Sequence, residues 1–271
     1  SLEQAGVHVV YGLVGLKTHC KVLLVVRQEA DGIRRYCHVG TGNYNPKTAT
    51  LYEDLGVFSA DPALGADLSE LFNYLTGYGH PRQLRRLIVA PSSLRPGLTQ
   101  RITEQGQPGG RIVMKMNALV DPVLIEALYE ASQKGAEIDL LVRGICCLHP
   151  GVPGLSERIR VRSIIGRFLE HSRIFRFGPN EGPAEYLIGS ADLMPRNLDR
   201  RIEALLTVTG SALQARLDEI LEVELADDVA AWELNADGTW TTVRGNSGIE
   251  SQRRLQELAL ARVQARSEQS A

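Results

Sequence analysis

Short apolar runs, typical of buried strands, alternate along this chain with segments whose apolar residues recur every three or four positions, as in helices. The strand-like runs cover residues 22–26, 35–39, 87–90, 112–116, 138–142, 174–177 and 186–188. The helix-like segments cover residues 68–78, 98–104, 121–135, 213–225 and 249–266. The strand, helix, strand order within residues 112–142 predicts parallel pairing through a right-handed crossover. The pattern therefore indicates an α/β fold with mixed β-sheets flanked by helices.

A cluster of residues that break helices, Gly77-Tyr78-Gly79-His80-Pro81, follows the helix-like segment at 68–78. We place a domain boundary at this cluster, so that the first domain covers residues 1–81 and the second covers residues 82–271. In the second domain a predicted strand ends at Arg143. Open parallel sheets bind ligands at this end of their strands, which makes Arg143 a candidate binding residue.

Two short patterns occur once in each predicted domain. His19-Cys20-Lys21 precedes Gly40-Thr41-Gly42-Asn43, and His171-Ser172-Arg173 precedes Gly189-Ser190-Ala191-Asp192. Each pattern encloses an apolar run, a polar turn and a second apolar run, so one hairpin recurs as an internal repeat. The first copy is truncated at its N-terminus, because only residues 1–18 precede His19. We interpret the chain, which opens at Ser1, as an excised fragment.

The repeated histidines suggest a phosphate site. If His19 and Lys21 lie on one strand, their side chains point to the same face, and the same holds for His171 and Arg173. A glycine-rich turn after a strand leaves backbone N–H groups free to approach an anion. A single histidine of this kind is more often a satisfied core residue, and only the duplication favours chemistry.

Charge and composition narrow the partners. The chain has 271 residues, a formal net charge of -2 and 44% hydrophobic residues, which argues for a globular protein and against nucleic acid as a partner. The apolar runs are too short to span a membrane. We expect a cytoplasmic protein, with membrane association only through partners. A local positive patch is expected from a group of nearby arginines, Arg158, Arg160, Arg162, Arg167, Arg173 and Arg176.

The four cysteines lack the spacing of a zinc site, so we predict no metal site built from them. We interpret Cys20, Cys37, Cys146 and Cys147 as small core residues in a reducing compartment.

The doubled pattern of histidine, any residue, then lysine or arginine, followed by Gly-Ser/Thr-x-Asn/Asp, resembles the phospholipase D superfamily. A closer resemblance, over nearly the whole chain, is to the C-terminal catalytic half of long-chain polyphosphate kinases. It is carried by Gly15-Leu16-Lys17-Thr18-His19-Cys20-Lys21, His38-Val39-Gly40-Thr41-Gly42-Asn43-Tyr44-Asn45, Leu141-Val142-Arg143-Gly144, Leu169-Glu170-His171-Ser172-Arg173 and Arg201-Ile202-Glu203. The resemblance implies two phospholipase D-like repeats, the first truncated.

This resemblance implies reversible transfer of the terminal phosphate of ATP to inorganic polyphosphate. His19 would be the nucleophile that forms a phosphohistidine, a role that suits an imidazole near pH 7. His171 would be the second catalytic histidine, and Lys21 and Arg173 would supply positive charge around the phosphoryl oxygens.

The resemblance also places Tyr52 beside the adenine base and Arg143 on the nucleotide phosphates, and we add Asn43 to the substrate-binding residues. A half-buried structural tyrosine is an equally good interpretation of Tyr52. Mg²⁺ is the implied cofactor, with its ligands expected mainly in an N-terminal part that is missing here. We further predict that Asp54 and Glu203 orient the two histidines, because an imidazole nucleophile needs one nitrogen anchored.

Two alternatives remain open. A phospholipase D-type phosphodiesterase or nuclease would carry an aspartate five residues after the motif cation, where this chain has Val26 and Gly178. A non-catalytic fragment that binds polyphosphate or nucleotide would keep the site without the reaction. A truncated first repeat would also leave sheet edges unpaired, so we expect a homo-oligomer.

Overall fold

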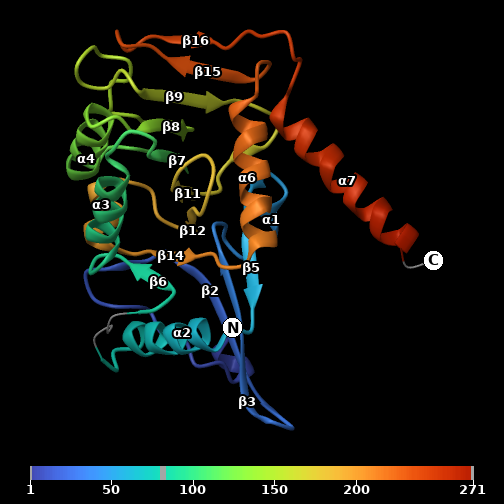
Figure 1. Ribbon diagram of the computed structural model, residues 1–271. Helices are drawn as coiled ribbons and strands as arrows, with labels where there is room; N and C mark the ends of the chain where they lie inside the picture. Colours follow the sequence, from blue (N-terminus) through green and yellow to red (C-terminus); the bar gives the residue numbers. More distant parts are fainter. Residues whose placement is uncertain (1, 80–83, 270–271) are drawn as a thin grey trace.

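The computed structural model describes residues 2–79 and 84–269 (Figure 1). The predicted domain boundary at residues 81–82 lies outside the described residues. The helices are η1 Glu3–Ala5, α1 Pro46–Ala49, α2 Pro62–Leu75, α3 Leu94–Gln105, α4 Pro122–Gln133, α5 Pro195–Arg200, α6 Ser211–Leu225 and α7 Ser251–Gln269. The strands are β1 Lys17–Thr18, β2 Lys21–Glu29, β3 Gly32–Gly40, β4 Tyr52–Glu53, β5 Gly56–Ser59, β6 Leu87–Val89, β7 Arg111–Met116, β8 Glu137–Val142, β9 Ile159–Ile164, β10 Leu169–Glu170, β11 Ile174–Phe177, β12 Glu185–Gly189, β13 Arg201–Ile202, β14 Ala204–Thr207, β15 Ala231–Leu234 and β16 Trp240–Thr242.

Below, the first half of the chain means residues 2–79 and the second half means residues 84–269. The second half is built on a mixed sheet. Among the described residues its strand order is β16-β15-β9-β8-β7-β11-β12-β14-β6, in which β7, β8 and β9 are parallel and the other pairs are antiparallel. Helices α3 and α4 cover one face through a core that includes Leu98, Leu128 and Phe175. Helix α6 covers the other face through Leu217, Ile220 and neighbouring residues (Figure 1). The arrangement confirms the predicted α/β class.

The first half repeats part of this plan. Strands β2, β3 and β5 form an antiparallel sheet, and α2 packs on it through Leu64, Leu68 and Leu71. In the second half, β11, β12 and β14 pair in the same antiparallel order and are followed by α6 as β5 is followed by α2. The hairpin that the sequence repeats is therefore the same structural unit in both halves.

Two short parallel ladders connect the halves. Strand β1 pairs with β13, with Lys17 opposite Arg201. Strand β10 pairs with β4, with Leu169 opposite Tyr52. Each ladder joins the segment before one motif histidine to a segment of the other half. Each motif histidine is therefore placed next to residues of the other half.

Several expectations need correction. His19 and His171 do not lie inside strands: each occupies the link between a two-residue strand and the next strand. Each short strand ends there because the backbone leaves the ladder with the other half, formed by β1 or β10, and enters the hairpin that begins with β2 or β11. Among the cysteines, Cys37 is buried and Cys147 is exposed, so the core interpretation is wrong for Cys147.

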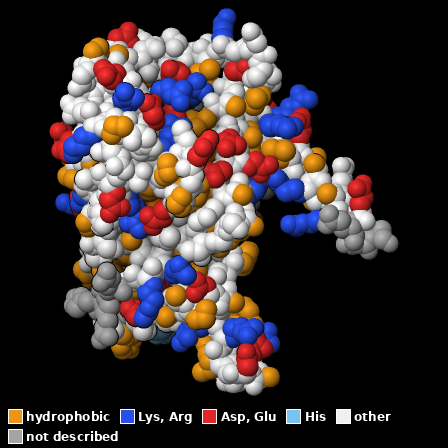
Figure 2. Space-filling model, in the orientation of Figure 1, with side chains coloured by type: hydrophobic (Ala, Val, Ile, Leu, Met, Phe, Trp, Pro, Cys, Tyr) orange, Lys and Arg blue, Asp and Glu red, His pale blue; other side chains and the backbone are white. Residues whose placement is uncertain are grey.

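The expected positive patch does not form, because most of its arginines pair with acidic residues. The pairs are Arg158 with Glu137, Arg160 with Asp139, Arg162 with Glu233, Arg173 with Asp192 and Arg176 with Asp218. Basic and acidic side chains are likewise intermixed on the face in Figure 2.

Helix α7 forms where a helix was predicted, but only its beginning packs against the body of the molecule. Its first residues, Ser251 and Gln252, are buried, whereas Leu260 and Val263 further along are exposed. The helix leaves the body of the molecule at an angle (Figure 1). None of the helices in the described ranges is long and apolar enough to cross a membrane.

Candidate active site

The first motif histidine contacts a carboxylate from the other half of the chain. His19 follows β1, and its Nδ1 lies 2.9 Å from Oε2 of Glu203, which follows β13. Glu203 is fully buried, and the hydroxyl of Ser190 donates to the same carboxylate oxygen. Lys21 donates from Nζ to the backbone oxygen of His19 at 2.5 Å. The carboxylate fixes the Nδ1 side of the ring and leaves Nε2 for a ligand.

The second motif histidine has the reciprocal arrangement. His171 Nδ1 lies 2.7 Å from Oδ1 of Asp54, which follows β4 in the first half. The hydroxyl of Thr41 donates to the same oxygen at 2.6 Å. The Tyr52 ring packs against the His171 ring, with centroids 4.9 Å apart. The structure thus places Asp54 and Glu203 in contact with the histidines, as predicted, but each carboxylate serves the histidine of the opposite half.

The glycine-rich turns hold these carboxylates in matching ways. The hydroxyls of Thr41 and Ser190 each donate to the carboxylate 13 residues further on. Each hydroxyl also accepts the next backbone N–H, from Leu55 and Ala204 respectively. The amides of Thr41 and Ser190 donate to the backbone oxygens of these two residues. These two amides are therefore occupied and cannot bind an anion as we expected of the turns.

Gly42 is required by the close approach of Asp54. A Cβ atom at this position would lie 2.1 Å from Oδ2 of Asp54. The turn can pass so near the carboxylate only because glycine has no side chain.

Arg173 lies beside His171 and contacts residues of both halves. It is 2% exposed, and its Nη2 lies 3.0 Å from Oδ2 of Asp192. Its Nη1 donates to the backbone oxygens of His171 and Thr41, at 2.7 and 3.3 Å, and so contacts both halves. The same nitrogen lies 3.3 Å from His171 Nε2.

The charge of Lys21 also depends on both halves. Burial lowers the pKa of Lys21 to about 8, and the nearby positive charge of Arg173 acts in the same direction, whereas Glu203 and Asp54 oppose the shift. Lys21 therefore faces charged groups from both halves. The two motifs share one electrostatic environment.

The remaining predicted residues lie in different settings. Arg143 donates from Nε to the side-chain Oδ1 of Asn117 at 3.0 Å, and the backbone N–H of Asn117 donates to Oδ1 of Asp192, the partner of Arg173. Arg143 is thus linked to the site through Asn117, which the sequence analysis missed. Asn43 is exposed, and within the described part of the chain its side chain makes no hydrogen bond to the other predicted residues.

Comparison with known proteins identifies the family. Residues 1–81 match polyphosphate kinase C-terminal domain 1, and residues 87–254 match polyphosphate kinase C-terminal domain 2. This chain belongs to the polyphosphate kinase family.

Relatives agree with this assignment. The polyphosphate kinase of Thermosynechococcus vestitus is 59% identical over 97% of this chain and 36% of its own length. The Streptomyces coelicolor polyphosphate kinase is 56% identical over 96% of this chain and 35% of its own length. The crystal structure of polyphosphate kinase from Porphyromonas gingivalis superposes with a TM-score of 0.87 at 34% identity, covering 100% of this chain and 42% of that one. The chain spans about a third of the length of these curated relatives.

The sequence analysis did not identify one buried cluster next to the candidate site. Lys115 is 3% exposed, and its ammonium group contacts the carboxylates of Glu53, Glu170 and Glu224. The sequence did contain a signal for this cluster, because Lys115 lies inside the apolar run 112–116 and a lysine in a buried strand needs acidic partners.

These carboxylates do not fit the Mg²⁺ that the family resemblance implies. Glu53, Glu170 and Glu224 bring ligand atoms within 4.8 Å of one another. However, the Lys115 ammonium contacts all three and supplies the positive charge that a cation would bring. Asp54 and Glu203 in turn contact the histidines. No reaction step is therefore derived through a metal at these residues.

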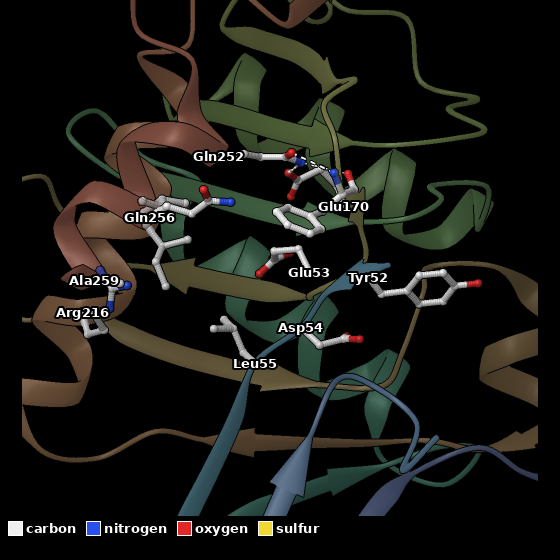
Figure 3. Close-up of a pocket in the computed structure, with 12 residues that line it drawn as sticks. Tyr52, Glu53, Asp54, Leu55, Glu170, Arg216, Gln252, Gln256 and Ala259 are labelled. Carbon is white, nitrogen blue, oxygen red and sulfur yellow. Dashed lines mark hydrogen bonds between the residues drawn. The ribbon is translucent and has the colours of Figure 1, made fainter. Parts of the chain in front are cut away.

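A cavity of about 390 Å³ lies beside β4 and β10, under α6 and α7. Figure 3 shows Tyr52 and Asp54 pointing to the side of β4 away from Glu53, as alternation along a strand requires. Arg143 does not line this cavity. The cavity thus lies on the side of this segment opposite to the one where Asp54 contacts His171.

Proposed function

We propose that this chain carries the phosphohistidine centre of an enzyme that transfers the terminal phosphate of ATP reversibly to inorganic polyphosphate. The observation that supports it most is the reciprocal pair of contacts, His19 with Glu203 and His171 with Asp54. Arg173, next to His171, adds a cation that contacts both halves. Family membership favours the same reaction. An imidazole with one nitrogen anchored and the other open is the arrangement that nucleophilic catalysis needs.

In the first step, His19 Nε2 attacks the terminal phosphorus of ATP. A phosphorus–nitrogen bond forms while the bond to the bridging oxygen breaks, and the electron pair of that bond leaves with ADP. Glu203 accepts the hydrogen bond from Nδ1–H and stabilises the positive charge that develops on the ring. In the second step, a terminal oxygen of polyphosphate attacks the phosphorus, and the bonding pair returns to Nε2.

The cations around the ring serve the transferred group. Lys21 and Arg173 supply positive charge near the phosphoryl oxygens, and Arg143 holds the nucleotide phosphates through its Asn117-fixed guanidinium. His171, anchored by Asp54, exchanges a proton with the leaving or attacking oxygen. Tyr52 contacts the nucleoside base from its position on His171, and Asn43 contributes to substrate binding from the exposed turn.

Labelling with ATP that carries ³²P at its terminal phosphate tests the proposal. The longest natural polypeptide that contains this chain should acquire an acid-labile, base-stable label, and His19→Ala should lose it. His38→Ala is the matched control: His38 lies within β3, and its Nδ1 contacts the Tyr44 hydroxyl rather than a carboxylate, so its variant should keep the label. Hydrolysis of a phosphodiester without labelling would instead support the phosphodiesterase alternative, and binding without reaction the non-catalytic one.

Self-association is part of the proposal. Within the described residues β2 pairs only with β3, which leaves one edge of its sheet open. Light scattering from the purified protein should therefore give the mass of an oligomer. A monomer at micromolar concentration would contradict the proposed self-association.

A further inference from the structure

The Lys115 cluster connects four elements at one buried point. Lys115 Nζ, on β7, lies 3.0 Å from Glu53 Oε2 on β4 and 2.5 Å from Glu170 Oε2 on β10, and it also contacts Glu224 on α6. Lys115 and Glu170 are 3% and 5% exposed. The contacts join a strand of the first half to three elements of the second.

Two of these carboxylates are neighbours of the site residues in sequence. Glu53 precedes Asp54, and Glu170 precedes His171. Glu53 Oε2 also accepts hydrogen bonds from the hydroxyl and amide of Ser172, the residue after His171, at 2.6 and 3.3 Å. A displacement of either carboxylate would therefore be passed directly to the Asp54–His171 hydrogen bond.

The ladder between β4 and β10 cannot hold this geometry unaided. It contains only two residue pairs, and in one of them Glu170 lies directly opposite Glu53. Like charges directly opposite one another destabilise a strand pair, and burial strengthens their repulsion. The Lys115 ammonium lies against both carboxylates and turns this repulsion into attraction.

Gln252, at the start of α7, fixes the same strand from another side. Its amide oxygen accepts from the Phe168 amide at 2.9 Å, and its amide nitrogen donates to the Phe168 oxygen at 2.8 Å. The same nitrogen donates to Glu170 Oε1 at 2.6 Å. The Gln252 side chain thus bonds the backbone of Phe168, the residue before β10, much as a neighbouring strand would, and Figure 3 shows it reaching Glu170 in β10.

The charge of the cluster supports this arrangement. Burial raises the pKa of Glu224 to about 8; the Lys115 ammonium opposes this rise, and the nearby charges of Glu170 and Glu53 add to it. For Glu53, the positive charge of Lys115 and hydrogen bonds from Ser172 outweigh the effect of burial and lower its pKa. At neutral pH the ammonium therefore faces an ionised Glu53, and Glu224 holds its proton.

We propose that Lys115 is a positioning residue for the His171–Asp54 pair, acting through Glu53 and Glu170, with Gln252 as the second anchor of β10. This inference rests on the proposed function for its catalytic consequence, though not for its structural one. The other histidine provides an internal reference, because Glu203, the carboxylate that anchors His19, bonds Ser190 rather than a member of the Lys115 cluster.

The test is Lys115→Met in the longest natural polypeptide that contains this chain. One readout is independent of activity: the NMR signal of the His171 Nδ1 proton. The hydrogen bond to Asp54 protects this proton from exchange with water, and the absence of the signal in His171→Gln assigns it. We expect this signal to disappear and the corresponding His19 signal to remain. We also expect kcat for phosphate transfer to fall about 10- to 100-fold, the cost of a misplaced group, with KM for ATP changed less than threefold.

Arg111→Met is the matched control. Arg111 begins the same strand, and at the far end of β7 from Lys115 it forms an ion pair with the buried carboxylate of Asp139. Its loss should lower thermal stability but leave the His171 signal and kcat as in the wild type. Equal effects of the two variants on the His171 signal would overturn the proposal, because a general loss of stability would then explain both.

Gln252→Leu covers the case in which Lys115→Met does not fold. It removes the amide bonds to β10 without leaving a buried carboxylate unpaired, since Glu170 retains Lys115. We expect a weakened His171 signal and a several-fold lower kcat. A folded variant with an unchanged signal and an unchanged kcat would overturn the proposal. If the wild-type protein transfers no phosphate, the proposed function fails, and the NMR comparison still decides whether Lys115 positions His171.

Discussion

Glu203 lies 2.9 Å from the ring of His19, although 184 residues separate them in the sequence. The contact exists because β1 pairs with β13, two residues from each half of the chain. Its counterpart, His171 with Asp54, depends in the same way on β10 and β4. Neither half of the chain contains a complete histidine–carboxylate pair, so the site exists only when the halves are docked.

Glu203→Gln should abolish most labelling of His19. A glutamine can donate to Nδ1 and so favour the tautomer with its proton on Nε2, which removes the nucleophilic lone pair. We expect the rate of phosphohistidine formation to fall by up to about 10⁴-fold, the loss caused by the same change at the carboxylate of a catalytic triad. Rapid-quench labelling measures this rate.

Asp54→Asn is the matched control for Glu203→Gln, because it makes the same change at the other histidine. It should lower turnover while leaving the first labelling of His19 closer to the wild-type rate. Identical labelling rates in the two variants would contradict the assignment of His19 as nucleophile.

We expect the rate of phosphate transfer to decline at alkaline pH because of Lys21. Its pKa of about 8 means that its positive charge is lost as the pH rises through that value. The rate should therefore fall above about pH 8, and Lys21→Arg, which stays charged, should remove that fall. Steady-state rates from pH 6.5 to 9.5 test this, and an unchanged alkaline limb in Lys21→Arg would count against the role of Lys21.

Glu224 should make the protein less stable as the pH rises. Its pKa is about 8 in the folded protein and 4.5 as an ordinary carboxyl, so the folded state binds more protons between these values. The free energy of unfolding then decreases with rising pH across this window. The charged groups that face Glu224 are Lys115 on β7, Glu170 on β10 and Glu53 on β4.

Glu224→Gln should remove this contribution, since the amide keeps the shape of the protonated acid without titrating. Melting temperatures measured from pH 5 to 8 should then fall less steeply in the variant, and its gain over the wild type should be largest near pH 8. A wild type and variant with parallel curves would contradict the assignment.

Gly42→Ala should damage the site through Asp54. The new Cβ would lie 2.1 Å from Asp54 Oδ2, so the carboxylate must move away from His171. We expect at least a tenfold loss of transfer activity and about 1–3 kcal/mol of stability. Gly97→Ala, in α3, is the control: its Cβ would meet ordinary contacts at 3.5 Å, and alanine favours a helix. Its activity should not change, and melting curves should show equal or higher stability.

Much of the fold could be predicted from local pattern. The strand at residues 112–116 and the helix beginning at Pro122 lie where the apolar spacing indicated. The repeated hairpin was also evident from the two histidine motifs. The sequence did not show how much of α7 packs against the rest of the molecule, because the same apolar spacing is compatible with a helix that projects from the body.

The site was predictable only in its parts. The motifs identified His19, Lys21, His171 and Arg173, and the need to anchor an imidazole drew attention to Asp54 and Glu203. The sequence did not show that each carboxylate serves the opposite histidine, nor that Lys115 lies between Glu53 and Glu170.

By itself, then, the sequence determined the elements, the repeat and the chemical types at the site, because burial and capping act between residues a few positions apart. The tertiary structure alone decided which half completes which histidine. That choice depends on two ladders of two residue pairs each, joining segments more than a hundred positions apart. No local pattern encodes such a pairing, since its stability comes from the cores and buried charges of both halves once they are docked.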